Sequence, residues 1–159
     1  MDRRWPFVLF MIVLIALHLF MRVGLGMEFW APDLLTIGLL LAARRMPAGM
    51  AAGLGLLLGL IRDSVNISTF GSDMVVMTIM GYLGSRSRDY FVGDSFFFLA
   101  IYLFLGKWLH DALYFVVGRA IGTRDAVSSL LVEAPIAAAY STLAGLIAYS
   151  AYRAFARER

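Results

Sequence analysis

The sequence contains no cysteine among its 159 residues and only two histidines. The absence of cysteine excludes a disulfide framework, thiolate metal ligands and a cysteine nucleophile. A metal site built on His18 or His110 would need carboxylates from other parts of the chain. A glycine-rich phosphate loop and a dinucleotide-binding fingerprint are also missing. We therefore expect a protein that is not an enzyme and that needs no cofactor.

Charged residues are scarce, at 16%, whereas hydrophobic residues make up 61% and form long runs between short charged clusters. This pattern leaves no room for a separate soluble domain and indicates a small polytopic membrane protein. The pI near 9.5 comes from arginines at the ends of apolar runs, which favours membrane topology over nucleic-acid binding. We expect a single all-α transmembrane domain over residues 1–159, in contact with the lipid bilayer.

The apolar runs predict six transmembrane helices, over about residues 5–23, 32–43, 47–61, 72–84, 94–117 and 130–152. The first run could instead be a signal peptide. Its apolar core is longer than the usual roughly 7–15 residues and no Ala-x-Ala site follows, so a retained helix is favoured. The second and third runs are short, so neighbouring helices or a thinned bilayer must shield their ends. Gly93, Asp94 and Ser95 are expected to cap the fifth helix.

The distribution of arginine predicts the orientation in the membrane. One side receives nine arginines: Arg3, Arg4, Arg44, Arg45, Arg86, Arg88, Arg153, Arg157 and Arg159. The other side receives Arg22, Arg62, Arg119 and Arg124. Because positive charge is retained on the cytoplasmic side, both termini should be cytoplasmic. Carboxylates gather at the opposite, external helix ends, including Asp33, Asp63, Asp73 and Glu133.

Small residues predict which helices are buried among others. The third helix carries two Gly-x-x-x-Gly pairs, Gly49 with Gly53 and Gly55 with Gly59. Such pairs let another helix approach closely enough for backbone contact. Ala48 and Ala52 fall near the face of the second pair. The last helix has a similar series that includes Ser141 and Gly145, so it should also be packed rather than exposed to lipid.

The fifth helix is interrupted by Lys107, His110 and Asp111. Their spacing of i, i+3 and i+4 places them on one helical face, where they can satisfy one another. Ionisable groups inside a membrane are costly and usually face a bundle interior or a wet cavity. The favoured interpretation is an internal ion pair that holds helices in register, joined by Arg62 or Asp63. A binding surface is the next alternative, and catalysis is the least favoured.

The hairpin over residues 32–63 carries a family resemblance. Its Pro32-Asp33-Leu34-Leu35 opening, its Ala42-Ala43-Arg44-Arg45 turn followed by Pro47 and Gly49, and its Gly55-to-Asp63 arm resemble the signature of the MreD family. Chain length, helix number and a last helix entered through Ala134-Pro135 agree with this resemblance. Lys107, His110 and Asp111 match no motif of the family.

The resemblance implies a non-enzymatic membrane scaffold of the bacterial elongation, or rod, complex in the inner membrane. It implies binding to an MreC-like bitopic protein, and action with MreB, RodA and the elongation transpeptidase in cell-shape control and lateral peptidoglycan synthesis. It also implies a fold similar to the six-helix substrate-binding subunits of energy-coupling-factor transporters. A vitamin-binding subunit of such a transporter is therefore the alternative function.

The external carboxylates suggest where a partner would bind. We expect Asp33, Asp63, Asp73 and Glu133, with Arg62 beside them, to form a surface that positions the partner's external segment. Charge on this surface would orient the partner, because exposed ion pairs contribute only about 0–1 kcal/mol each. Apolar contacts between transmembrane helices would supply most of the affinity. The simpler alternative is that these carboxylates are solvated helix caps.

Overall fold

The structure is a computed structural model that describes residues 5–24, 26, 31–65, 70–88, 95–117 and 129–157. Within these residues it contains helices and no strands. The α-helices are α1 (Trp5–Leu19), α2 (Leu34–Ala43), α3 (Ala48–Asp63), α4 (Ser72–Ser87), α5 (Phe96–Val117) and α7 (Ala134–Arg157). Short π-helical segments, η1 (Phe20–Gly24) and η3 (Ser129–Glu133), extend α1 and precede α7. The expected cap at Gly93 and Asp94 lies outside the described residues.

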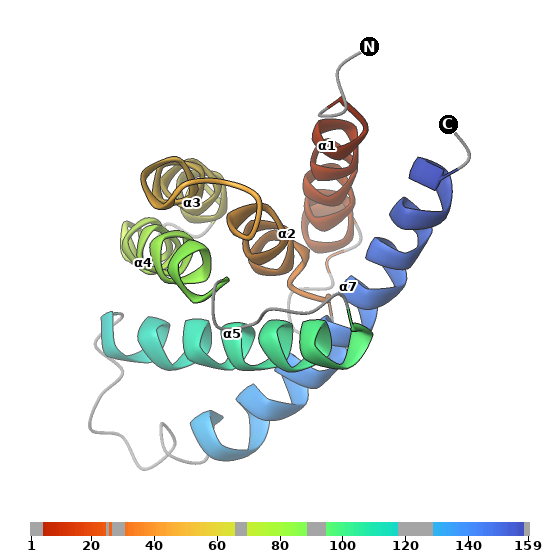
Figure 1. Cartoon of the computed structure of the whole chain (residues 1–159). Coiled ribbons are helices and arrows are strands. Elements are labelled where there is room, and N and C mark those ends of the chain that lie inside the picture. Colours follow the sequence, from red (N-terminus) through yellow and green to blue (C-terminus); the bar gives the residue numbers. More distant parts are fainter. Residues whose placement is uncertain are drawn as a thin grey trace.

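The short helix α2 is the centre of the molecule. All ten of its residues are buried, and it contacts α1, α3, α4, α5 and α7. In Figure 1, α1 to α4 are seen nearly end-on, whereas α5 lies across the view and α7 curves from beneath it toward α1. The apolar run of α2 carries no charge because its neighbours surround it on every side.

Three helices are long and apolar enough to cross a membrane: Trp5–Gly24, Phe96–Val117 and Leu130–Phe155. The other three helices are shorter than these spans: α2 has 10 residues, and α3 and α4 have 16 each. At 1.5 Å per residue a 16-residue helix is about 24 Å long, which is less than the roughly 30 Å hydrocarbon core. The described residues therefore form an all-helical membrane protein in which three of the helices meet the length of a span.

Helices α3 and α4 are in backbone contact. A Cβ atom at Gly55 would overlap the backbone carbonyl of Met77, and one at Gly59 would meet the backbone of Asp73 and Met74. Gly81 on α4 lies in the same way against the backbone of Ala51. Glycine is needed at these positions because any side chain would separate the two helices.

The other glycine pair of α3 does not take part in this contact. A Cβ atom at Gly49 or Gly53 would meet nothing within 4 Å, which differs from the expectation that both pairs are packed. Ala51, Gly55 and Gly59 follow one another at helical spacing and form the face toward α4. Gly49 and Gly53 are displaced from that face by two residues, or about 200° around the helix.

Aromatic side chains hold together the end of the bundle that carries Arg44 and Arg45. The arginine distribution predicts that this end faces the cytoplasm. The guanidinium of Arg45 lies 4.3 Å from the ring centroid of Phe7 and donates a hydrogen bond of 3.3 Å to the hydroxyl of Tyr152. Buried Tyr102 donates to the carbonyl oxygens of Leu40 and Gly84, at 3.1 and 3.2 Å. These contacts join α1, α2, α4, α5 and α7 at the end opposite to the polar residues described next.

Candidate functional site: a buried polar network beside a cavity

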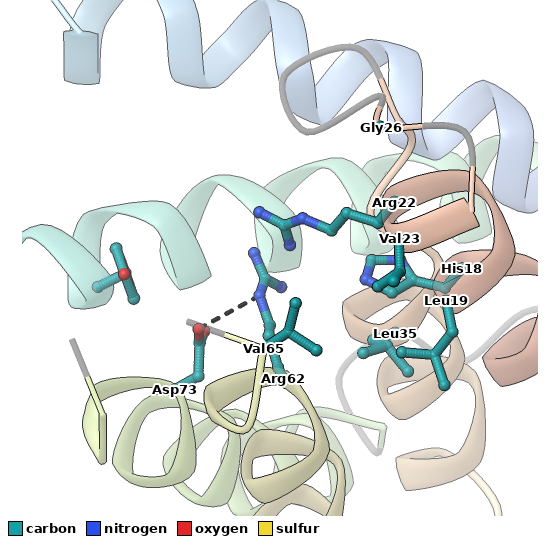
Figure 2. A pocket seen from close by; sticks show the side chains of 10 residues that line it. His18, Leu19, Arg22, Val23, Gly26, Leu35, Arg62, Val65 and Asp73 are labelled. Atoms are coloured by element: carbon teal, nitrogen blue, oxygen red, sulfur yellow. Dashed lines mark ion pairs between the residues drawn. The ribbon is translucent and has the colours of Figure 1, made fainter. Parts of the chain in front are cut away.

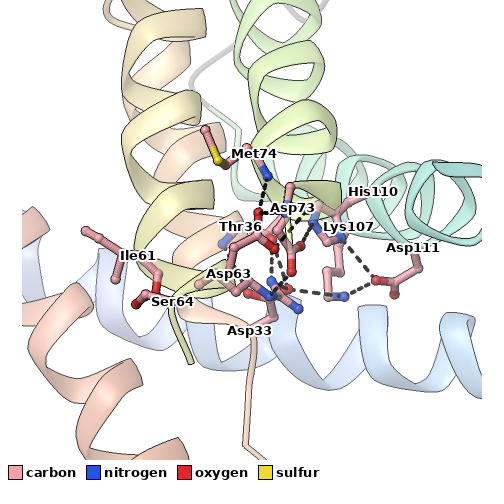
Figure 3. A network of polar contacts seen from close by, with 12 residues as sticks. Asp33, Thr36, Ile61, Asp63, Ser64, Asp73, Met74, Lys107, His110 and Asp111 are labelled. Carbon is pink, nitrogen blue, oxygen red and sulfur yellow. Dashed lines mark hydrogen bonds and ion pairs between the residues drawn. The ribbon is translucent and has the colours of Figure 1, made fainter. Parts of the chain in front are cut away.

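Ionisable side chains from the ends of three helices and from the middle of α5 meet inside the bundle (Figure 3). We define the polar network as Asp33, Arg62, Asp73, Lys107, His110 and Asp111. Asp33 precedes α2, Arg62 lies near the end of α3, Asp73 is in the first turn of α4, and α5 supplies the rest. Because each helix contributes only one or a few polar residues, the network exists only when the helices are assembled.

Asp33 is the residue that joins the two cations. Its Oδ2 lies 2.7 Å from Nη1 of Arg62 and 3.3 Å from Nζ of Lys107. Its side chain also accepts from the backbone nitrogen and the hydroxyl of Thr36, at 3.2 and 2.8 Å, and so caps α2. The backbone nitrogen of Asp33 donates to Oγ of Ser141 on α7, at 3.0 Å. One residue therefore links the start of α2 to α3, α5 and α7.

The residues of α5 pair with one another and with α4. Lys107 forms an ion pair with Asp111, and Nδ1 of His110 lies 3.2 Å from Oδ1 of Asp111. The other ring nitrogen of His110, Nε2, is 3.5 Å from Oδ1 of Asp73, whose Oδ2 is 3.3 Å from Nε of Arg62. Lys107 and His110 are only 5% and 1% exposed. Each buried charge thus has an opposite charge beside it, which is the condition for burying charges at all.

Asp63 caps α4 instead of joining the network directly. Its carboxylate accepts from the backbone nitrogens of Gly71 and Met74, both at 3.0 Å, and of Asp73 at 3.3 Å. These are the amide groups that have no partner within the helix at its first turn, and a carboxylate there also complements the helix dipole. Gly71, with φ of 95°, makes the left-handed turn that brings α4 back to Asp63.

The expected docking surface of exposed carboxylates is not what the structure contains. Asp33, Asp63 and Asp73 are 5%, 0% and 2% exposed, because Arg62, the α5 cations and backbone amides turn them inward. Glu133 is exposed on η3, and within the described residues it makes no ion pair with the network. The alternative of solvated caps holds only in part: Asp33 and Asp63 do cap α2 and α4, but all three carboxylates are buried.

The residues expected to pack helices lie at several contacts. Gly55 and Gly59 contact α4, while Ala48 and Ala52 are half-buried. Ser141 is buried and accepts from Asp33, and a Cβ atom at Gly145 would overlap the side chain of Ile37 on α2. In the part of the chain that the structure describes, no group of three or more histidine and acidic side chains is arranged to hold a metal ion.

A cavity of about 380 Å³ adjoins the network (Figure 2). Arg62 and Asp73 form its border with the network, and His18, Arg22 and Tyr114 line it elsewhere together with aliphatic side chains. The pairing of His18 with Arg22 at this cavity is not predicted from the sequence. The two residues are spaced i, i+4 in an otherwise apolar run. This spacing places both side chains on one helical face and could have indicated a shared site.

The comparisons with known proteins agree with the resemblance carried by the hairpin. Residues 1–150 match the family described as rod shape-determining protein MreD. No curated protein and no solved structure matches the chain at a significant level. Since the family match covers nearly the whole chain, this helical membrane protein belongs to the MreD family and has a role in rod shape determination.

Proposed function

We propose that this chain is a non-enzymatic scaffold subunit of the bacterial elongation complex in the inner membrane, with both termini cytoplasmic. It binds an MreC-like bitopic protein and, through a larger assembly with MreB, RodA and the elongation transpeptidase, supports lateral peptidoglycan synthesis. The family match supports the role in cell shape. The nine-to-four arginine distribution supports the orientation.

The observation that carries the scaffold role is that the cations of the polar network pair with carboxylates of the same network. Arg62 and Lys107 each contact two carboxylates, so the buried charges connect helices and present no activated group to a substrate. Large apolar side chains instead face outward, among them Ile12, Val13, Leu57, Ile136 and Ile147, each more than half exposed. Outward apolar faces suit contact with lipid and with the transmembrane helix of a partner.

Co-purification with the MreC-like protein of the same organism tests this proposal. The partner should be retained in mild detergent and should stay bound when the salt concentration is raised from 0.1 to 1 M. Apolar helix contacts are insensitive to salt, whereas exposed ion pairs are screened. Complete loss of the partner at high salt would contradict the apolar mode of binding. Failure to recover the partner at any salt concentration would contradict the scaffold role.

A second candidate function is substrate binding, as in the vitamin-binding subunits of energy-coupling-factor transporters. The cavity of about 380 Å³ favours it, because ligand pockets commonly measure 300–1,000 Å³. The two functions differ in what accompanies the purified protein. A bound vitamin identified by mass spectrometry, with no retained bitopic partner, would favour the transporter function.

A further inference from the structure

The cavity contains a cation and a histidine that the polar network does not use. Arg22, on η1, is half-buried, and no carboxylate of the described residues lies within ion-pair distance of it. Its side chain extends in the direction of Arg62 in Figure 2. Arg62 contacts Asp33 through Nη1 and Asp73 through Nε, and no hydrogen bond from Nη2 reaches a described residue. Two guanidinium groups therefore have donors available at one cavity.

His18 supplies a second and independent sign of a ligand. It lines the cavity and is only 3% exposed, yet its Nδ1 has no hydrogen-bond partner among the described residues. Buried polar atoms are nearly always paired, so an unpaired one calls for an explanation. The unpaired Asp73 Oδ1 and His110 Nε2 differ, because these two atoms face each other at 3.5 Å. Thr142 Oγ1 is also buried and unpaired, but Thr142 does not line the cavity.

The position of the cavity and the residues that line it indicate which chemical class of ligand it could bind. It lies where η1 ends, where α2 begins and where α3 ends. Helix ends of a membrane protein commonly lie near the interface, where phosphate groups of lipids are found. Leu19, Val23 and Val65 form an aliphatic wall next to the arginines. A volume of 380 Å³ far exceeds the space that one water needs. Guanidinium groups bind phosphate through paired hydrogen bonds.

We propose that this cavity binds a phosphate ester, with Arg22 and the free edge of Arg62 on the phosphate, His18 on an ester or hydroxyl oxygen, and the aliphatic wall on the organic part. The phosphate ester is either the headgroup of an anionic lipid or a soluble organic phosphate. The site is separate from the scaffold role, because neither the family match nor the pairing within the network depends on it.

Two probes distinguish the sources of the phosphate. Dioleoyl phosphatidylglycerol is titrated into the detergent-solubilised protein and followed by native mass spectrometry, and sn-glycerol 3-phosphate is titrated and followed by calorimetry. Arg22→Gln removes the cavity cation. Arg86→Gln is the matched control, because Arg86 is exposed near the other end of α4. Arg22→Lys retains the charge and reports whether loss of binding reflects misfolding.

One of the two probes should bind to the wild-type protein and to Arg86→Gln with equal affinity. Arg22→Gln should bind it at least about tenfold more weakly, as expected for loss of a charge-assisted hydrogen bond, and Arg22→Lys should fall between. Binding of the lipid alone identifies a headgroup site, and binding of glycerol phosphate identifies a soluble ligand. Equal binding to wild type and Arg22→Gln, no binding of either probe, or binding of succinate in preference to both would overturn the proposal.

Discussion

At the scale of single residues, the structure makes Asp33 the member of the polar network that matters most for stability. Asp33→Leu removes the carboxylate shared by Arg62 and Lys107 as well as the cap of α2. Breaking a buried pair by removing one partner costs about 3–5 kcal/mol. We expect the thermal midpoint of the purified Asp33→Leu variant to fall sharply, or the variant not to accumulate.

Glu133→Leu is the control for Asp33→Leu, because Glu133 is exposed and surface substitutions usually change stability by less than about 0.5 kcal/mol. Asp111→Leu should be intermediate, since Lys107 keeps Asp33 as a partner at 3.3 Å. Equal thermal midpoints for Asp33→Leu and Glu133→Leu would show that Asp33 does not hold the helix ends together.

The sequence predicts part of this network and misses the rest for a physical reason. The i, i+3, i+4 spacing of Lys107, His110 and Asp111 was enough to expect one shared face and an internal ion pair. The sequence could not show that Asp33 and Asp73 turn inward, because their burial depends on how α5 lies against three other helices. Carboxylates at expected helix ends were therefore interpreted as exposed, although the cations of α5 and Arg62 neutralise them inside.

At the scale of helices, the contact between α3 and α4 depends on the absence of side chains at Gly55 and Gly59. We expect Gly59→Leu to force the two backbones apart and to destabilise the protein by at least about 1–3 kcal/mol, the usual cost of overpacking. Gly53→Leu is the matched control on the same helix, since a Cβ atom at Gly53 meets nothing within 4 Å.

Thermal unfolding of the two variants in detergent provides the measurement. Gly53→Leu should retain or slightly raise the thermal midpoint, because leucine favours helix over glycine by several tenths of a kcal/mol. Gly59→Leu should lower it. If both variants melt at the temperature of the wild type, the close approach of α3 and α4 is not required for folding.

The start of α4 provides a local prediction. Asp63→Ala removes the carboxylate that accepts from the backbone nitrogens of Gly71, Asp73 and Met74. Loss of a capping side chain costs about 0.5–2 kcal/mol. Hydrogen exchange should become faster at the first turn of α4 and stay unchanged at the middle of α5. Uniformly faster exchange in both helices would mean that Asp63 acts on the whole fold and not as a cap.

The helix ranges expected from the apolar runs overlap the six described α-helices. They overlap because arginine, glycine and proline bound each hydrophobic run, and the helices begin and end near these residues. The sequence could not predict that Gly49 and Gly53 lack a partner, since a Gly-x-x-x-Gly pair does not state which helix face meets a neighbour. It also could not predict that α2 lies at the centre, although its run from Leu34 to Ala43, which carries no charge, is consistent with burial on all sides.

At the scale of the whole molecule, the distribution of arginine predicts the orientation. Fusions of a reporter that is active only in the cytoplasm, and of one active only outside it, are placed after Arg159 and at Ser68. The cytoplasmic reporter should be active at Arg159 and the external reporter at Ser68, because nine of the thirteen arginines are assigned to the side of the termini. External activity at Arg159 would reverse the topology.

The central claim that we propose is that the polar network holds the bundle together and performs no chemistry, so that the protein acts as a scaffold. The most direct test replaces the α5 members together, as Lys107→Met, His110→Leu and Asp111→Leu, and leaves Arg62 paired with Asp33. Replacing both partners of a buried ion pair, here Lys107 and Asp111, by apolar residues is often tolerated. Cell width is then measured in the source organism with the variant as sole copy, at matched membrane abundance. We predict normal rod shape, whereas round cells containing wild-type amounts of folded variant would contradict the account.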